Sequence, residues 1–212
     1  GSIDYVPSGG SPGYTYSWSN GATSQDLSSL AAGTYDVIMT DINGCTQSTT
    51  ITLVEPTPLV QNVLSPTYPS GDNISCFGLN DGSLDYVPSG GSPGYTYAWS
   101  TVDGSGITVG SEDQIGLTAG TYDVTMTDIN GCTQSTTITL VEPTPLVQNI
   151  SSPTYPSGDN ISCFGFNDGS IDYVPSGGSP GYTYSWSNGA TSQNLSSIAE
   201  GTYDVTMTDI NG

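Results

Sequence analysis

The stretch LTAGTYDVTMTDINGC, residues 117–132, decides the fold. Between Tyr122 and Met126 apolar side chains alternate with polar ones, which predicts a strand with one buried face. The Asn-Gly pair that follows predicts a tight turn into a second strand, Cys132–Val141. The stretch therefore indicates an antiparallel β structure.

The same stretch is part of a tandem repeat that fills the 212-residue chain. The run GSIDYVPSGGSPGYTYSWS at Gly1 returns almost unchanged at Gly82 and Gly169. Segments of sequence VEPTP, whose prolines favour an extended connector, mark the boundaries between copies. The predicted domains are repeat 1, residues 1–56, partial and without its first strand; repeat 2, residues 57–143, complete; and repeat 3, residues 144–212, partial and without its last strand. The simplest explanation is a window cut from a longer array.

Repeat 2 predicts about seven short strands and no helix, because no segment has the apolar spacing of a helix. The first strand is expected at Leu59–Leu64 and, after a Pro-rich loop, to continue through Asn73–Cys76. Trp99 is expected to be buried on the third strand, and Tyr122 stands where a tyrosine corner would form. These features predict an all-β fold of tandem immunoglobulin-like Greek-key β-sandwiches.

The chain has no Lys, Arg or His and a formal net charge of −20. Without cations it cannot neutralise phosphates, which excludes nucleic-acid binding and adhesion to anionic lipid through a basic patch. Without histidine it has no Ser-His or Cys-His nucleophile pair. No stretch approaches the ~18 apolar residues of a membrane span, so no membrane insertion is expected in this segment. The composition is typical of a soluble, extracellular, β-rich protein.

The cysteines recur at two positions of the repeat, which predicts disulfides in an extracellular array. Val124 stands where antibody domains have a Cys, so the usual inter-sheet bridge is absent. One hypothesis pairs the first-strand Cys of a repeat with the late-turn Cys of the next repeat, so that Cys76 would bond a residue just past Gly212. The alternative pairs Cys76 with Cys132 inside one repeat. The disulfide candidates are Cys45, Cys76, Cys132 and Cys163.

Recurring aspartates are the candidates for acid–base or metal chemistry. Paired carboxylates could cleave glycosides, but Asp123 alternates outward on a strand and Asp128 opens a D-I-N-G turn, where Asp is favoured. We therefore expect no enzymatic activity. Hard divalent ions prefer oxygen ligands, so Ca²⁺ bound at turns near the domain junctions is a further hypothesis, with plain turn residues as the alternative. The metal candidates are Asp81, Asp128, Asp168 and Asp209.

Two features predict sugars or contacts on the surface. The N-x-S/T pattern, which predicts a glycoprotein, occurs at Asn73, Asn149, Asn160 and Asn194. Tyr68 and Tyr155 lie in Pro-flanked PTYPSG loops and are the aromatics expected to contact a neighbour or a ligand. Packing over the sandwich edge is the alternative for both tyrosines.

The order of three motifs resembles a known family. The motifs are C-F-G-x-N-D-G-S, V-P-S-G-G-S-P-G-Y-T-Y-x-W-S and L-x-x-G-T-Y-D-V-x-M-T-D-I-N-G-C. Together they resemble the SprB-type repeat of giant surface proteins of Bacteroidota, a repeat named after a gliding-motility adhesin. The resemblance covers each copy except its linker and first strand. It implies immunoglobulin-like modules in long surface or secreted filaments.

Near-identical copies suit a structural and adhesive fibre, in which many weak identical sites add up. The expected function is a repeat array of a bacterial extracellular filament or giant surface adhesin. The alternatives are an array of carbohydrate-binding modules and a calcium-rigidified spacer that presents a distal ligand-binding domain. The expected partners are neighbouring repeats stacked head to tail, with a multi-chain fibre and a surface polysaccharide as further options.

Overall fold

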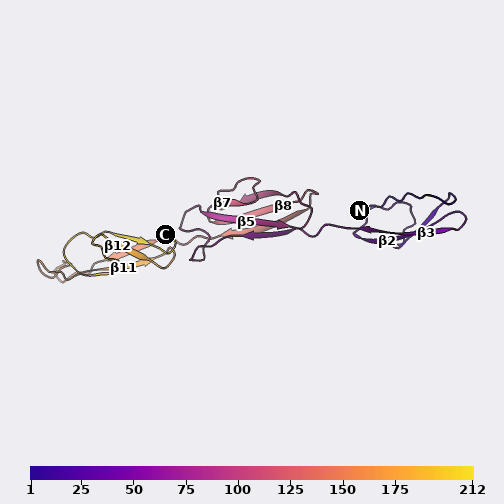
Figure 1. Ribbon diagram of the computed structural model, residues 1–212. Coiled ribbons are helices and arrows are strands. Elements are labelled where there is room, and N and C mark those ends of the chain that lie inside the picture. Colours follow the sequence, from indigo (N-terminus) through magenta and orange to yellow (C-terminus); the bar gives the residue numbers. More distant parts are fainter. The chain divides into compact units, whose positions relative to one another are not determined.

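The computed structural model describes residues 1–212 (Figure 1). All paired strands are antiparallel, and there is no helix. The chain divides into two compact units, Gly1–Thr57 and Pro58–Gly212. The first unit contains repeat 1, and the second contains repeats 2 and 3.

Repeat 2 is a sandwich of two three-stranded sheets, with strand orders β4-β5-β7 and β6-β8-β9. The chain crosses between the sheets three times, from β5 to β6, from β6 to β7 and from β7 to β8, as in the Greek-key topology of an immunoglobulin-like domain. This confirms the predicted fold class, with six strands in place of about seven. The strands are β4 (Val60–Leu64), β5 (Gly82–Ser89), β6 (Thr96–Thr101), β7 (Gln114–Leu117), β8 (Gly120–Thr127) and β9 (Thr133–Leu140).

Repeats 1 and 3 contain parts of the same sandwich. Repeat 1 has one sheet, β1-β2-β3, and an isolated bridge between Ile3 and Leu27. Repeat 3 has two sheets, β10-β11-β13 and β12-β14, without a counterpart of β9. The strands are β1 (Thr15–Trp18), β2 (Gly33–Thr40), β3 (Thr46–Leu53), β10 (Val147–Ser151), β11 (Gly169–Ser176), β12 (Thr183–Trp186), β13 (Leu195–Ile198) and β14 (Val205–Thr208).

Aromatic side chains from both sheets meet in the core of repeat 2. Tyr86 on β5 is 1% exposed, and its ring packs edge-on against Tyr97 and Trp99 of β6 with centroid distances of 5.1 and 6.0 Å. Aromatic pairs prefer this T-shaped geometry. Burial raises the pKa of Tyr86 to about 12. The packing of aromatic rings therefore joins the two sheets of the sandwich.

The recurring tryptophan occupies the same place in each repeat. Trp18 and Trp186 are buried, and each packs edge-on against a tyrosine, Tyr5 or Tyr173. In all three repeats the indole N–H donates to a backbone carbonyl at 2.8 Å. The expected burial is thus found in repeats 1 and 3, whereas Trp99 is half-buried.

A tyrosine corner forms in every repeat. Tyr35 and Tyr203 donate their hydroxyl protons to the carbonyl four residues upstream, at 3.1 and 3.0 Å. Tyr122 makes the same bond to Thr118 at 2.8 Å, and its hydroxyl also lies 2.9 Å from the carbonyl of Ser105. Ser105 belongs to the longer loop that only repeat 2 contains, and this loop covers Tyr122 completely.

The predicted continuation of the first strand through Asn73–Cys76 is wrong. These residues form bends, because the N–H groups of Asn73 and Ile74 both donate to the carbonyl of Val141, at 2.9 and 3.1 Å, instead of joining a ladder. The Asn73 side chain in turn accepts the N–H of Val141 at 3.0 Å. The segment therefore closes over the end of β9, and Ile74 is fully buried.

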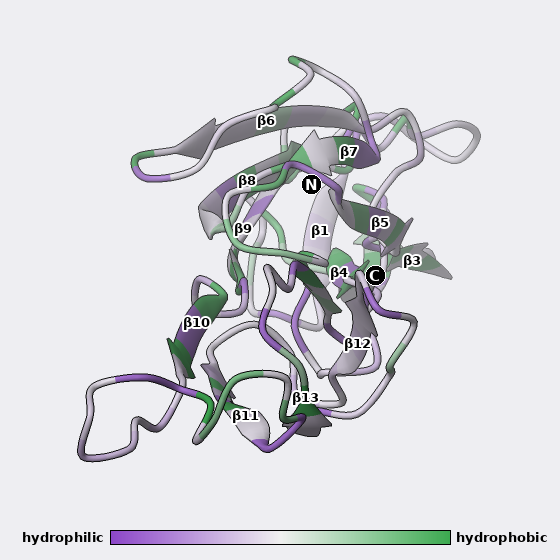
Figure 2. Ribbon diagram, turned by 90° about the vertical axis from the view of Figure 1, so that its left-hand side faces the viewer, coloured by the Kyte–Doolittle hydropathy of each residue, from purple (hydrophilic) through white to green (hydrophobic).

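Strand β9 is the edge of its sheet and pairs only with β8. Its sequence, TQSTTITL, contains no Lys or Pro, two residues that often protect edge strands from pairing with another chain. Repeat 3 has no such strand, and part of its apolar surface is open. Ile150 of β10 is 50% exposed, whereas its counterpart Val63 in repeat 2 is half-buried, and green segments mark β10 in Figure 2.

We expect Tyr122→Phe to destabilise repeat 2, because the carbonyl of Thr118 loses its buried donor. Such a loss costs about 1–3 kcal/mol of unfolding free energy. Urea unfolding measures it through the fluorescence of Trp99, in a background that carries Trp18→Phe and Trp186→Phe.

Tyr35→Phe is the matched control, followed through Trp18 with the other two tryptophans replaced. Tyr35 makes one bond from a half-buried position, so we expect a smaller loss. Equal losses for the two variants would contradict the role given to the longer loop of repeat 2.

Candidate functional site

Each repeat has a D-I-N-G turn at one end of its sandwich. In repeat 2 the carboxylate of Asp128 accepts the backbone N–H groups of Asn130 and Cys132, both at 2.9 Å. It also accepts the N–H of Ser92, at 2.9 Å, from the S-G-G-S-P-G turn between β5 and β6. One carboxylate therefore joins two turns. The D-I-N-G turns are Asp41–Gly44, Asp128–Gly131 and Asp209–Gly212.

Repeats 1 and 3 place their aspartates in the same way. Asp41 accepts three backbone N–H groups at 2.9–3.0 Å, and Asp209 accepts two, from Ser179 and Asn211, at 2.9 and 3.0 Å. The carboxylate residues are buried or nearly so, with exposures of 9% for Asp41, 4% for Asp128 and 6% for Asp209. The aspartate predicted as a plain turn residue is thus a buried link between two turns.

Backbone N–H groups compensate the charge of these carboxylates. The hydrogen bonds from Ser92 and Cys132 hold the pKa of Asp128 below its ordinary value of 3.8, against the opposing effect of burial. The pKa of Asp41 is lowered too, with the bond from Ser11 as the largest cause. A carboxylate that accepts several N–H groups is stabilised in its charged form without any cation.

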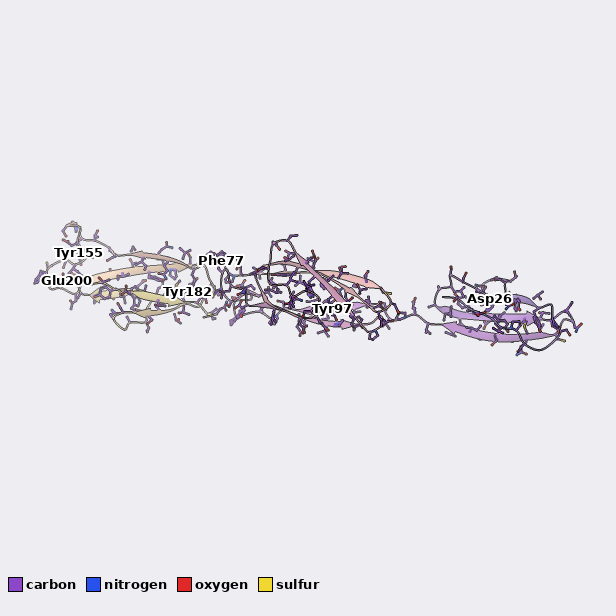
Figure 3. All side chains as sticks on the ribbon, turned by 90° about the horizontal axis from the view of Figure 1, so that it is seen from above. Asp26, Phe77, Tyr97, Tyr155, Tyr182 and Glu200 are labelled. Carbon is purple, nitrogen blue, oxygen red and sulfur yellow. The ribbon has the colours of Figure 1, made fainter.

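The other two metal candidates lie at the opposite end of the sandwich and bind tyrosines. Tyr68 donates its hydroxyl proton to Asp81 at 2.9 Å, and Tyr155 donates to Asp168 at 3.1 Å. These bonds are the largest cause of the raised pKa of each tyrosine. Figure 3 labels Tyr155 at this end of repeat 3 and Tyr182 at the other end. The two aromatics predicted for outside contacts are therefore fixed to their own repeats, although Tyr155 is 39% exposed.

No group of three His, Cys, Asp or Glu side chains lies close enough to hold a metal ion. The candidate carboxylates already accept backbone N–H groups or tyrosine hydroxyls, as described above. Calcium takes six to eight oxygen ligands, so binding at these aspartates would have to displace such bonds. Calcium binding stays a prediction, which a melting experiment with a chelator would test.

All four cysteines are free thiols, so the structure does not support the predicted disulfides. In repeat 2, Cys76 follows the bend over the end of β9, and Cys132 directly precedes the first residue of β9. Eight residues of strand, roughly 26 Å, separate these two ends. A disulfide needs Cα atoms within about 7 Å, so the geometry disfavours the alternative in which Cys76 pairs with Cys132.

The four sequon asparagines differ in accessibility. Asn73 is half-buried, and its amide donates to Ser65 at 2.9 Å while accepting the N–H of Val141, so a glycan there would break the closure of repeat 2. Asn149, Asn160 and Asn194 are exposed. Glycosylation stays a prediction, and these three positions are the ones that the folded chain leaves accessible.

A cavity of about 530 Å³ lies in repeat 3. Ile171, Ile198 and Tyr203 contribute to its wall. Their counterparts in repeat 2 pack around Leu140, the last residue of β9. The cavity of repeat 3 therefore corresponds to the place that the end of β9 occupies in repeat 2, and it is not shaped as a pocket for a small ligand.

Sequence reasoning missed Asn211, whose counterparts read as ordinary residues of an Asn-Gly turn. Its side-chain N–H groups lie 2.9 Å from the hydroxyl of Ser179 in the same turn region. They also lie 2.8 Å from the carbonyl of Ser75 and 3.2 Å from the hydroxyl of Ser70, both in repeat 2. No sequence signal distinguishes Asn211 from Asn43 or Asn130; only the contact between repeats does.

Three segments of the chain match the SprB repeat family, at residues 1–23, 71–104 and 158–191. One segment falls in each copy, which confirms the resemblance drawn from the motifs. No curated protein matches the chain.

Two of the solved structures that match the chain differ widely from it in sequence. A 282-residue C-terminal fragment of intimin, in complex with the intimin-binding domain of the translocated intimin receptor, is 16% identical with a TM-score of 0.36. That match covers 64% of this chain, and the chain spans about half, 54%, of the length of the intimin chain. The amphioxus IgVJ-C2 molecule is 13% identical with a TM-score of 0.29, covering 66% of this chain and 94% of that one.

The structure contains no helix of the length and apolar character needed to cross a membrane.

We expect acid to weaken the link between the two turns in repeats 1 and 2, where the pKa of the aspartate is lowered. Because the pKa of Asp128 is lower in the folded chain than its ordinary value of 3.8, the stabilisation is present above that value and is lost as the pH falls through the folded pKa. The melting temperature should therefore fall as the pH drops below 3.8, the ordinary value. Calorimetry at a series of pH values measures this.

Asp128→Asn should lower the melting temperature of repeat 2 at neutral pH and flatten its decline in acid. Asp123→Asn is the matched control, since Asp123 is exposed on β8 and accepts only a threonine hydroxyl, at 2.5 Å. An acid profile that is the same in both variants would refute the link through Asp128.

Proposed function

Since three segments of the chain match the SprB repeat family, we propose that the chain is a stretch of the shaft of a bacterial extracellular filament or giant surface adhesin. In this role the repeats supply length, and adhesion arises from many weak identical sites along the array. The cell surface is the proposed location, and neighbouring repeats are the proposed partners.

The observation that supports this function is that all copies use the same residues in the same way. Residues 1–44 and 169–212 differ at only four positions. Each D-I-N-G carboxylate links its two turns, and each corner tyrosine and tryptophan makes the same bond. A catalytic or specific binding protein needs one differentiated site, whereas a spacer benefits from identical modules.

The absence of catalysis is part of the proposal. Glycoside cleavage needs two carboxyl groups that flank the scissile bond, one of them free to donate a proton. The buried aspartates are instead engaged with backbone N–H groups, and a carboxylate with a lowered pKa is a poor general acid. Immunoglobulin-like repeat domains typically serve as structural modules.

Force spectroscopy on the native array tests the spacer function. Pulling should unfold one repeat at a time, in a sawtooth with steps of roughly 30 nm, because a repeat of 87 residues extends by about 3.5 Å per residue. The evenness of the spacing is the decisive result. Irregular steps, or smooth extension without force peaks, would overturn the proposal of an array of independent folded modules.

A binding experiment separates the proposal from its two alternatives. Beads that carry many copies should retain a surface polysaccharide that the free 212-residue chain does not measurably retain. Tight binding by the free chain would favour an array of carbohydrate-binding modules. A drop in melting temperature on addition of a calcium chelator would favour the calcium-rigidified spacer.

A further inference from the structure

The junction between repeats 2 and 3 lies within one compact unit and brings three segments together. The first is the cysteine-containing segment of repeat 2, residues 75–80. The second is the linker VEPTP, residues 141–145, and the third is the D-I-N-G turn of repeat 3, residues 209–212. Residues 1–56 contain no counterpart of residues 75–80, so this is the junction at which the chain supplies the surfaces of both neighbours.

The D-I-N-G turn of repeat 3 contacts repeat 2 directly. The side-chain amide of Asn211 donates to the carbonyl of Ser75 at 2.8 Å and lies 3.2 Å from the hydroxyl of Ser70. The backbone N–H of Asn211 donates to the carboxylate of Asp209 at 3.0 Å, and this carboxylate also accepts the N–H of Ser179 at 2.9 Å. Asn211 is therefore held by its own repeat while its side chain bonds to the neighbouring repeat.

The start of the linker is bonded to repeat 2. Val141 donates to the Asn73 side chain at 3.0 Å, and the carboxylate of Glu142 accepts the N–H of Gly78 at 2.6 Å. As a result Glu142 is half-buried and Pro143 is buried. The equivalent residues of the other linker, 54–56, are all exposed. The linker therefore packs against a repeat only where the cysteine-containing segment is present.

The end of the linker is bonded to repeat 3. The N–H of Gly178, in the S-G-G-S-P-G turn, donates to the carbonyl of Thr144 at 2.7 Å. A Cβ atom at the preceding glycine, Gly177, would overlap the carbonyl oxygen of Pro145, so glycine permits this close approach. Only Pro143, whose ring fixes φ, separates Thr144 from the bonded residue Glu142. The linker thus has little freedom to act as a hinge.

The junction also buries apolar surface, as equivalent residues show by their exposure. Ile210 is 50% exposed, whereas its counterparts Ile42 and Ile129, which face no neighbouring repeat in this chain, are both 71% exposed. Phe77, labelled in Figure 3, is 55% exposed, and its counterpart Phe164 is 97% exposed. Removing apolar surface from water stabilises the contact in addition to the hydrogen bonds.

Three carboxylates lie at the junction, those of Asp81, Glu142 and Asp209. Each accepts a backbone N–H group, and Asp81 also accepts the hydroxyl proton of Tyr68. Hydrogen bonds to a charged acceptor are stronger than those between neutral groups. Neutral donors therefore compensate the charges at the junction, and the contact does not depend on a bridging cation.

We propose that this junction is a rigid joint that recurs along the array, in which each repeat binds the D-I-N-G turn of the next repeat of the same chain and fixes its orientation. The proposal rests on the proposed function, because it takes the chain to be a stretch of a longer array. Coupling between nearest neighbours makes such an array a stiff shaft instead of a flexible string of modules. The sequences that form the joint recur unchanged: VEPTP at 54–58 and 141–145, SCFG at 75–78 and 162–165, and DING at 41–44, 128–131 and 209–212.

Distance measurements by pulsed electron spin resonance on the 212-residue chain test the joint. Nitroxide labels are attached through Ala98→Cys and Ser185→Cys, at equivalent exposed positions of β6 and β12. The four native cysteines are replaced by serine, since no bond described at the junction uses a thiol. We expect one narrow distribution of the distance between the labels. A broad distribution in this background, as a flexible linker gives, would overturn the proposal.

A double variant removes the two polar contacts of the joint that use side chains of the turn and the linker. Asn211→Ala with Glu142→Ala should at least double the width of the distance distribution. The matched control is Asn130→Ala with Glu55→Ala, because Asn130 donates to Ser92 within its own repeat and Glu55 is exposed. The control should leave the width unchanged. Equal widths for the two double variants would contradict the joint.

A calcium chelator provides the last comparison. The width should stay the same after chelation, and a broader distribution would overturn a joint held by neutral donors. None of these results changes the spacing of the force sawtooth, which depends on the number of residues in each repeat. Failure of this inference is therefore distinguishable from failure of the proposed function.

Discussion

A chain with twenty carboxylates and no cationic side chain has to stabilise its charges with neutral donors, and this constraint governs the structure. The D-I-N-G aspartates meet it with backbone N–H groups, and Asp81 and Asp168 meet it with tyrosine hydroxyls and serine N–H groups. Hydrogen bonds to a charged acceptor are stronger than those between neutral groups. Each carboxylate that must be buried thereby becomes a point where separate turns or loops are joined.

The placement of these joints gives each repeat two different ends. At one end, the D-I-N-G carboxylate holds its turn against the S-G-G-S-P-G turn. At the other end, a tyrosine of the Pro-rich loop bonds to an aspartate that also accepts a serine N–H from the cysteine-containing segment, residues 75–80 in repeat 2. The contact between Asn211 and Ser75 brings one kind of end against the other kind. A module with two unlike ends can be added repeatedly in one direction, because one end of each module contacts the unlike end of the next module.

The sequence alone is sufficient to predict the fold class, the turns, the tyrosine corners and the place of the tryptophans, since each depends on local residue patterns. It fails at Asn73–Cys76, a segment with the residue pattern of a strand. This segment forms bends instead, because its backbone bonds to Val141, a residue 68 positions away from Asn73. It likewise treats Asp128 as a turn residue and misses its bond to Ser92, because alternation and turn signals carry no information about which turns meet in space. Asn211 is the clearest case. Its D-I-N-G sequence is identical to that of residues 41–44, yet Ile210 is less exposed than its counterpart Ile42, because only the turn of repeat 3 contacts another repeat.

The edge strand β9 has a consequence for the behaviour of such arrays in bulk. The Gln134 carbonyl accepts an N–H of the Gln61 side chain, but no further strand pairs with the outer edge of β9, and its hydroxyl-rich side chains carry no positive charge. Mutual repulsion of the acidic modules opposes such pairing. Arrays of such repeats should therefore stay dispersed at low salt and gather into bundles at high salt or in acid, so that salt and pH together would set the thickness of a bundle.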